Sequence, residues 1–293
     1  MPVNLFAPID SLIKEANAEP QKAQLLRYQA YDNQQQTQPL YQAYRETRPP
    51  TTNDYSGLLN GISVSVKDLY GVAGLQTYAG TAYTFDNCIS NGPLVQALVD
   101  QGAYIIGKTH TVEFAFGGLG TNPHWPIPYN PWDKQQHRVP GGSSAGAPVS
   151  LLTHSCQLAL GTDTSGSVRV PAAMCGTFGI KTSTGRWDKQ NIVPLSPSID
   201  SAGLLARTAA DALWGFAVMD PVSCDDPQAL ITQLQQPLSS NLQGIRIGYI
   251  PDYFADCEDG IDNVVMAALA QLSKAGATLV ELAWPGLEES WQL

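Results

Sequence analysis

The chain has 293 residues, of which 43% are hydrophobic and 14% are charged, a composition that predicts a folded globular protein. Its formal net charge of −10 argues against nucleic acid or an anionic membrane surface as a main partner, because either would require clustered Lys and Arg. The sequence has no apolar run near the roughly 20 residues that span a bilayer, and its N-terminus lacks the pattern of a secretory signal.

The first segment, residues 1–56, is expected to form a helical layer of one or two helices with a break at the Gln-rich stretch 34–36. Its apolar positions are sparse, so we expect this layer to pack at the periphery of the main body. A Pro-Pro-Thr-Thr-Asn stretch at 49–53 separates it from residues 57–293, which we expect to form the main domain.

The next segment has the alternation of a strand. Ile62, Val64 and Val66 alternate with serines, and Lys67 ends the run. This period of two directs the apolar set toward a core and delivers Lys67 on the opposite face. Taken alone, a lysine at a strand end equally fits a surface residue whose aliphatic stem packs on apolar neighbours.

Helices and buried strands alternate along the remaining chain. Pro93 opens a helix that runs to Gln101 and stops at Gly102. Thr208 and Asp211 form the pattern of a capping box ahead of another helix. Further strands are expected at 104–106, 158–160 and 178–180, and a last strand–helix–strand unit at 245–250, 262–274 and 278–282. This alternation predicts an α/β fold with helices on both faces of the sheet.

The five cysteines are odd in number, unevenly spaced and without the spacing of metal ligands. We therefore expect reduced thiols in a cytoplasmic protein, because disulfides are rare in the cytosol.

A first glycine-serine loop occupies residues 141–146. It lacks the lysine of a phosphate-binding loop, and its glycine spacing does not fit a dinucleotide-binding motif. Ser144 is a plausible N-cap for a helix that runs to Leu152, which places Ser143 at a helix N-terminus. By itself this loop also fits a purely structural turn and cap.

A second loop, Thr164-Ser165-Gly166-Ser167, follows a buried strand and precedes Pro171, a natural first residue of a helix. Open α/β sheets bind ligands at the carboxyl ends of their strands. Consecutive backbone N–H groups turned the same way form an anion-binding nest, the geometry of an oxyanion hole. Taken alone, this string fits a turn as well as a site.

A nucleophilic serine requires a base. Of the four histidines only His154 is near a serine loop, and it lies toward the far end of the expected helix, so a Ser-His-Asp triad is unsupported. A lysine serves as base when burial lowers its pKa from about 10.4 toward roughly 7–8. Lys67 is the candidate for this role.

With these residues assembled, the chain resembles the amidase signature family. The matching segments are 61–68, 107–109, 130–133, 141–146, 161–171 and 179–182, within a core at 58–215. The resemblance implies an α/β/α sandwich in which helices cover both faces of a large mixed sheet. The chain is short for this family, so we expect the C-terminal part of the fold to be missing.

The resemblance also implies a Ser–cis-Ser–Lys triad. Ser167 matches the acylated nucleophile, Ser143 the bridging serine after a cis peptide, and Lys67 the base. The backbone N–H groups of Thr164, Ser165, Gly166 and Ser167 match the oxyanion hole. Structural support is expected from Ser144, Asp163 and Arg169, and a pocket wall from Phe116 and Gly117.

The implied reaction is hydrolysis of a non-peptide carboxylic amide, a small molecule, without a metal or organic cofactor. A homodimer is one candidate assembly. An amidotransferase A-type subunit that releases ammonia for a partner is the alternative, although Val170 stands where those subunits have Gln, and Ser165 replaces the family's usual Gly. A catalytically incomplete scaffold and a histidine-based serine hydrolase complete the alternatives.

Overall fold

The computed structural model describes residues 4–51, 55–86, 88–222, 225–235, 241–254, 257–258 and 260–283. The chain forms two compact units, Met1–Gln233 and Leu234–Leu293. No helix among the described residues is both long and apolar enough to cross a membrane.

The first unit is built on a six-stranded mixed sheet with the order β1-β3-β2-β4-β6-β5. Its strands are β1 (Tyr44–Thr47), β2 (Ser63–Lys67), β3 (Tyr104–Thr109), β4 (Leu158–Asp163), β5 (Phe178–Lys181) and β6 (Ser201–Ala206). β2 runs parallel to both β3 and β4, whereas β1 and β6 pair antiparallel with their neighbours. The carboxyl ends of β2 and β4 therefore meet at one edge of the sheet.

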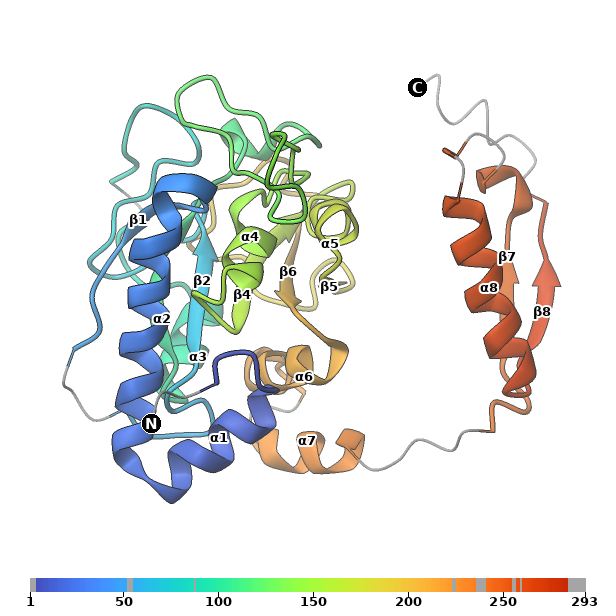
Figure 1. Cartoon of the computed structure of the whole chain (residues 1–293), viewed down its shortest axis with the longest axis horizontal. Helices are drawn as coiled ribbons and strands as arrows, with labels where there is room; N and C mark the ends of the chain where they lie inside the picture. The colour runs from blue at the N-terminus through green and yellow to red at the C-terminus, as the bar shows by residue number, and fades with distance from the viewer. Residues whose placement is uncertain are drawn as a thin grey trace. The chain divides into compact units, whose positions relative to one another are not determined.

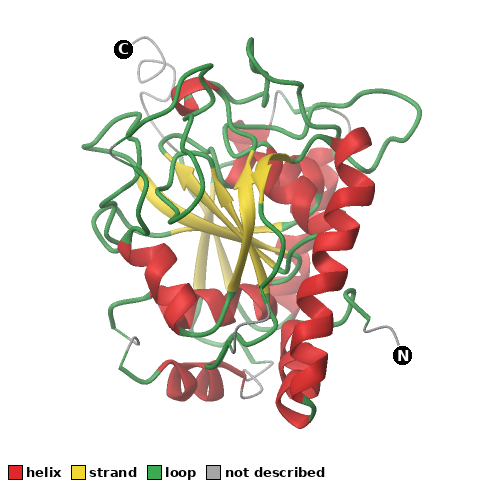
Figure 2. Ribbon diagram, turned by 90° about the vertical axis from the view of Figure 1, so that its left-hand side faces the viewer, coloured by secondary structure: helices red, strands yellow, loops and turns green. Residues whose placement is uncertain are grey.

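Helices cover both faces of this sheet, as Figure 2 shows. The helices as far as Gln235 are α1 (Ile9–Ala18), α2 (Pro20–Tyr41), α3 (Pro93–Asp100), α4 (Gly146–Leu152), α5 (Arg169–Cys175), α6 (Ala209–Met219) and α7 (Pro227–Gln235), and all are labelled in Figure 1. One buried apolar cluster joins α1, α3 and α6 to Val64 and Leu160, and a second joins α4 and α5 to Ala159 and Leu205. Because neighbouring strand residues point to opposite faces, this arrangement confirms the expected α/β/α sandwich.

The expected break at residues 34–36 is wrong, because α2 continues through them to Tyr41. The interruption lies earlier, where Glu19 separates α1 from α2 and Pro20 occupies the first turn of α2. Proline is favoured there because its missing N–H has no partner in a first turn anyway, and glutamine is a good helix former. A left-handed Gln42 ends the helix.

Most of the remaining predicted elements are confirmed. The helix that begins at Pro93 ends at Asp100, and β2, β3, β4 and β5 lie where alternation or apolar runs predict strands. In the capping box, the Thr208 hydroxyl accepts a hydrogen bond from the Asp211 N–H and donates one to the Asp211 carboxylate. Sequence patterns did not reveal β1, a short polar edge strand, or β6, which is composed of small and apolar residues without alternation.

The second unit contains the expected strand–helix–strand. β7 (Arg246–Tyr249) and β8 (Thr278–Glu281) pair in parallel, and α8 (Ile261–Lys274) connects them. A positive φ at Gly276 turns the chain from α8 into β8.

Candidate active site

Lys67 ends the central strand β2 and is completely buried, so the surface reading of this lysine is wrong. Its ammonium nitrogen donates to the Ser143 hydroxyl at 2.7 Å and to the Thr162 hydroxyl at 2.8 Å. Burial lowers the pKa of Lys67 from 10.5 to about 7, although the carboxylates of Asp163 and Asp200 raise it in part. A neutral amine is therefore accessible near neutral pH.

Ser143 follows a cis peptide bond, Gly142–Ser143, as the resemblance implies. The loop requires glycine here, because a Cβ on Gly142 would lie 2.6 Å from the backbone nitrogen of Gly120. The Ser143 carbonyl accepts a hydrogen bond from the Val112 N–H at 3.2 Å. These constraints hold the Ser143 side chain beside Lys67, with both side chains excluded from solvent.

Ser167 lies in the loop between β4 and α5 and borders a cavity. Its carbonyl accepts a hydrogen bond from the Ser144 N–H at 3.2 Å, so the two serine loops are tied together. Within the described part of the chain, no hydrogen bond joins the Ser167 and Ser143 hydroxyls. The structure therefore brings Lys67 and Ser143 into direct contact and presents Ser167 at the cavity surface.

Asp163 organises the loop that carries Ser167. Its carboxylate accepts the N–H groups of Gly166 at 2.7 Å and Val168 at 3.1 Å, and forms a two-pronged ion pair with Arg169 at 2.9 and 3.0 Å. Burial raises the pKa of Asp163, but the Arg169 guanidinium and the two N–H groups outweigh it and leave the pKa below its ordinary value. Two of the three expected support residues, Asp163 and Arg169, thus act on one turn.

The expected set of four oxyanion donors requires one correction. The Gly166 N–H donates to Asp163, because a positive φ at Gly166 turns it into the loop. The N–H groups of Thr164, Ser165 and Ser167 donate to no acceptor among the described residues, and all three residues line the cavity. Three amides therefore remain for a negatively charged oxygen.

The expected cap role of Ser144 is also wrong. α4 begins at Gly146 with Ala145 as its N-cap, and no side chain caps it. The buried Ser144 hydroxyl instead donates to the Thr162 carbonyl at 3.4 Å. It occupies the space left by Gly161, where a Cβ would lie 2.8 Å from the Ser144 oxygen. Ser144 therefore holds its loop against β4.

A cavity of about 550 Å³ opens over Ser167. Phe116 and Gly117 line it, as expected, and Ala115, Leu195, Ser196 and Ile199 also line it. None of the described lining residues is charged. Sequence patterns missed the segment that contains Leu195 and Ile199, because a proline-containing loop carries no periodic signal.

A second buried lysine lies near Lys67 but is differently placed. The ammonium of Lys108 forms an ion pair with Asp68 at 3.1 Å and donates to the Thr77 hydroxyl at 2.8 Å. A lysine paired with a carboxylate retains its charge more readily than an unpaired one. Lys67 donates to the hydroxyls of Ser143 and Thr162 and to the Thr162 carbonyl, and to no carboxylate, so it is the better base.

The described part of the chain contains no candidate metal site and no disulfide. No group of three or more His, Cys, Asp or Glu side chains in this part could hold a metal ion. Cys156 and Cys175 are buried free thiols, and Cys88 and Cys257 are half-buried ones. Cys224 lies outside the described residues.

Comparison with known proteins gives one consistent family. A family model described as Amidase matches residues 12–293. The 2-amino-5-chloromuconic acid deaminase of Comamonas testosteroni is 49% identical over 239 residues, which cover 81% of this chain and 50% of that protein. The A subunit of the glutamyl-tRNA(Gln) amidotransferase of Microcystis aeruginosa is 36% identical over 78% of this chain and 48% of its own. The chain thus spans about half the length of these curated relatives.

Solved structures agree on the fold. The peptide amidase of Stenotrophomonas maltophilia superposes with a TM-score of 0.78 at 25% identity, over 95% of this chain and 63% of that one. The A subunit of the Thermotoga maritima glutamyl-tRNA(Gln) amidotransferase superposes with a TM-score of 0.84 at 24% identity, over 98% and 63%.

Proposed function

The chain belongs to the amidase family, and we propose that it hydrolyses a small, non-peptide carboxylic amide through an acyl-enzyme on Ser167. The observation that carries this proposal is the buried contact between Lys67 and Ser143, tied through the Ser144 backbone to the loop that presents Ser167. A buried lysine whose pKa lies near 7 has the properties of a general base.

In the acylation step, the Ser167 hydroxyl rotates to reach Ser143 and passes its proton to it, while Ser143 passes its own proton to neutral Lys67. The Ser167 oxygen attacks the amide carbonyl carbon. The N–H groups of Thr164, Ser165 and Ser167 bind the oxygen that becomes negatively charged. The relay then returns a proton to the leaving nitrogen as the C–N bond breaks, so an amine or ammonia leaves.

Deacylation uses the same groups in the same order. A water molecule gives a proton to the relay and attacks the ester carbonyl on Ser167. The bond between the acyl carbon and the Ser167 oxygen breaks, the relay restores the serine proton, and a carboxylic acid is released. Every proton that Lys67 accepts is returned within the cycle, so no external acid or base is consumed.

The cavity favours a substrate with an uncharged acyl group. Apolar side chains of Phe116, Val170, Leu195 and Ile199 line the cavity that Ser167 borders, and no charged side chain is among the described lining residues. Removing a charge from water without a partner is costly, so an ionised acyl group is disfavoured in this part of the site.

The amidotransferase alternative is supported by the relatives that are named as A subunits. Against it stand Val170, in place of the Gln expected of such subunits, and the uncharged cavity. Glutaminase activity that requires a second protein would favour this alternative. A catalytically incomplete scaffold would retain the contact between Lys67 and Ser143 but would release no product from any amide.

The test is product release from a panel of amides. We would incubate the 293-residue chain with benzamide, hexanamide and glutamine, and measure ammonia and acid. Equimolar release from the apolar amides, lost in Ser167→Ala, supports the proposal. Release from glutamine alone contradicts the proposed substrate class, and release that persists in Ser167→Ala contradicts the nucleophile.

A further inference from the structure

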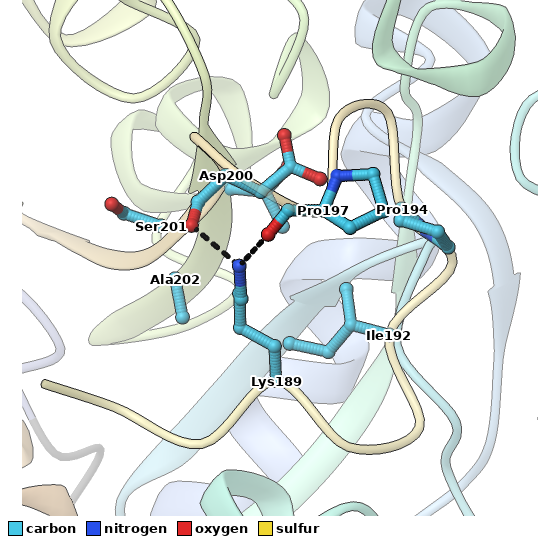
Figure 3. A pocket seen from close by; sticks show the side chains of 8 residues that line it. Lys189, Ile192, Pro194, Pro197, Asp200, Ser201 and Ala202 are labelled. Atoms are coloured by element: carbon cyan, nitrogen blue, oxygen red, sulfur yellow. Dashed lines mark hydrogen bonds between the residues drawn. The ribbon is translucent and has the colours of Figure 1, made fainter. Parts of the chain in front are cut away.

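One loop separates two cavities beside the proposed nucleophile. Leu195, Ser196 and Ile199 face the cavity over Ser167. The other side of the same loop borders a second, smaller cavity of about 210 Å³, shown in Figure 3. Its lining residues are Thr162, Lys189, Ile192, Pro194, Pro197, Asp200, Ser201 and Ala202. The position of this loop therefore fixes the shape of the substrate cavity from behind.

Asp200 joins this loop to the proposed oxyanion loop. One carboxylate oxygen accepts the N–H groups of Leu195 and Ser196, each at 2.9 Å. The other accepts the hydroxyl of Thr164 at 2.5 Å. Hydrogen bonds to an ionised acceptor are shorter and stronger than neutral ones. The buried Asp200 carboxylate thus connects the cavity wall at Leu195 and Ser196 to Thr164. Thr164 also lines the cavity, and its own N–H group donates to no acceptor among the described residues.

Lys189 stabilises the same loop but does not bind the Asp200 carboxylate. Its ammonium donates to the carbonyl oxygens of Pro197 at 2.8 Å and Asp200 at 2.9 Å, which closes the loop on itself. Figure 3 shows the Asp200 carboxylate directed away from Lys189. β6 begins at the next residue, Ser201, so the carboxylate is also anchored to the sheet.

We propose that Asp200 is a positioning residue for the hydrolytic reaction. Through Thr164 it holds the oxyanion N–H groups at a fixed distance from the wall formed by Leu195 and Ser196. The inference rests on the proposed role of the Ser167 loop. Loss of one oxyanion donor costs about 10²–10³-fold in rate, and a displacement of about 1 Å near a reacting centre can cost about 10²-fold.

The first test removes the hydroxyl and keeps the carboxylate. In Thr164→Val we expect kcat to fall by about 10–100-fold, less than the loss of a whole donor, with KM nearly unchanged. Thr164→Ser, which retains a hydroxyl, should restore most of this rate. Asp200→Ala should lower kcat and also raise KM, because it frees the N–H groups of Leu195 and Ser196 in the cavity wall.

The second test separates position from charge. The carboxylates of Asp163 and Asp200 are the two charged groups that act on the buried Lys67 ammonium. Asp200→Asn removes one of them, so the rise of kcat/KM with pH should move to lower pH. Thr164→Val leaves both carboxylates in place and should lower the rate without moving the profile. The charge of Asp200 acts on Lys67 whatever else this residue does, so the profile reports the charge alone. If Asp200 had a merely structural role, Thr164→Val would leave the rate per folded enzyme unchanged.

Thr153→Val is the matched control, because it removes another buried hydroxyl, one that donates to the Val149 carbonyl at 2.9 Å at the end of α4. Its kinetics should equal those of the wild type. Unchanged kcat in Thr164→Val, or a loss that Thr164→Ser does not restore, would overturn the inference.

Amide hydrogen exchange distinguishes this inference from the proposed function. Thr164→Val should speed exchange at Leu195 and Ser196 by more than about tenfold even if the wild type hydrolyses nothing, because the carboxylate that accepts these N–H groups loses its second anchor. Exchange that matches the wild type would overturn the connection itself. Absence of any Ser167-dependent hydrolysis in the wild type would overturn only the proposed function.

Discussion

Lys67 and Ser143 are 76 positions apart in the sequence, yet their side chains meet at 2.7 Å and neither is exposed to solvent. β2 delivers the lysine from the middle of the sheet, and the loop before α4 delivers the serine after a cis peptide. The contact joins a cation to a neutral hydroxyl in a site closed to bulk solvent. Such a lysine loses its proton far more readily than one in solution.

Replacement of Lys67 with methionine keeps the volume and removes the base. We expect kcat/KM to fall by about 10²–10⁴-fold, the usual contribution of a general base. The measurement is the initial rate of ammonia release. Lys14→Met, at an exposed site on α1, is the control and should be as active as the wild type. Activity in Lys67→Met within about threefold of the wild type would exclude the lysine as base, since even a weak general base contributes more.

The pH dependence of the reaction follows from the pKa of Lys67 near 7. Below this pH the lysine is protonated and cannot accept a proton, so kcat/KM should fall tenfold per pH unit. Above it, kcat/KM should reach a plateau. The measurement is kcat/KM of the wild type between about pH 5 and pH 9 at constant ionic strength. A flat profile across pH 7 would contradict a lysine base.

The lowered pKa of Lys67 also changes how the free energy of unfolding depends on pH. The direction is opposite to that for a lysine in a salt bridge, whose pKa is raised. The folded-state pKa of Lys67 lies below its ordinary value of 10.5, so the unfolded chain binds more protons between about pH 7 and 10.5. The free energy of unfolding contributed by Lys67 therefore rises with pH across this window. Lys67→Met should be more stable than the wild type at pH 6, and the difference should shrink as the pH increases. Urea unfolding at several pH values tests this.

The Gly142 position excludes a side chain. Gly142→Ala would place a Cβ 2.6 Å from the Gly120 nitrogen, so either this loop or the Gly120 backbone must shift. We expect destabilisation of about 1–3 kcal/mol and loss of most activity. Gly118→Ala, where no atom lies within 4 Å of the added Cβ, is the control for thermal unfolding. Equal melting temperatures for the two variants would contradict this steric explanation.

Arg169 stabilises the ionised form of Asp163. Arg169→Met should lower the rate, because the carboxylate then lacks the two-pronged partner that fixes the Ser167 loop. Arg169→Lys should recover only part of it, since an ammonium cannot reproduce the guanidinium fork. The folded-state pKa of Asp163 is lowered, so its stabilising contribution is present above its ordinary value of 3.8 and is lost as the pH falls. The stability difference between the wild type and Arg169→Met should therefore vanish in acid.

The sequence predicted what local patterns and the family motif encode. Alternation predicted β2 with Lys67 at its end, and the two glycine-serine strings predicted both site loops. Long-range contacts were not predictable in this way. Nothing local to Ser144 indicates that its hydroxyl faces β4 instead of capping α4, because that choice depends on the space above Gly161.

Asp200 illustrates the same limit. Its partners are Thr164, on another strand end, and two N–H groups of its own loop. A lone aspartate in a loop that contains proline and serine has the pattern of an ordinary turn. Likewise, the Gly166 N–H donates to Asp163 because Gly166 has a positive φ, and the sequence alone does not specify this angle.

A mapped covalent adduct would show most directly whether Ser167 is the nucleophile that Lys67 and Ser143 activate. The wild type and the variants Ser167→Ala, Ser143→Ala and Lys67→Met would be treated with a fluorophosphonate, digested and analysed by mass spectrometry. We expect one adduct on Ser167 in the wild type, none on this peptide in Ser167→Ala, and labelling at least about tenfold slower in the other two variants. An adduct on another serine, or labelling of Ser167 that is as fast without Lys67 and Ser143, would contradict the proposed relay.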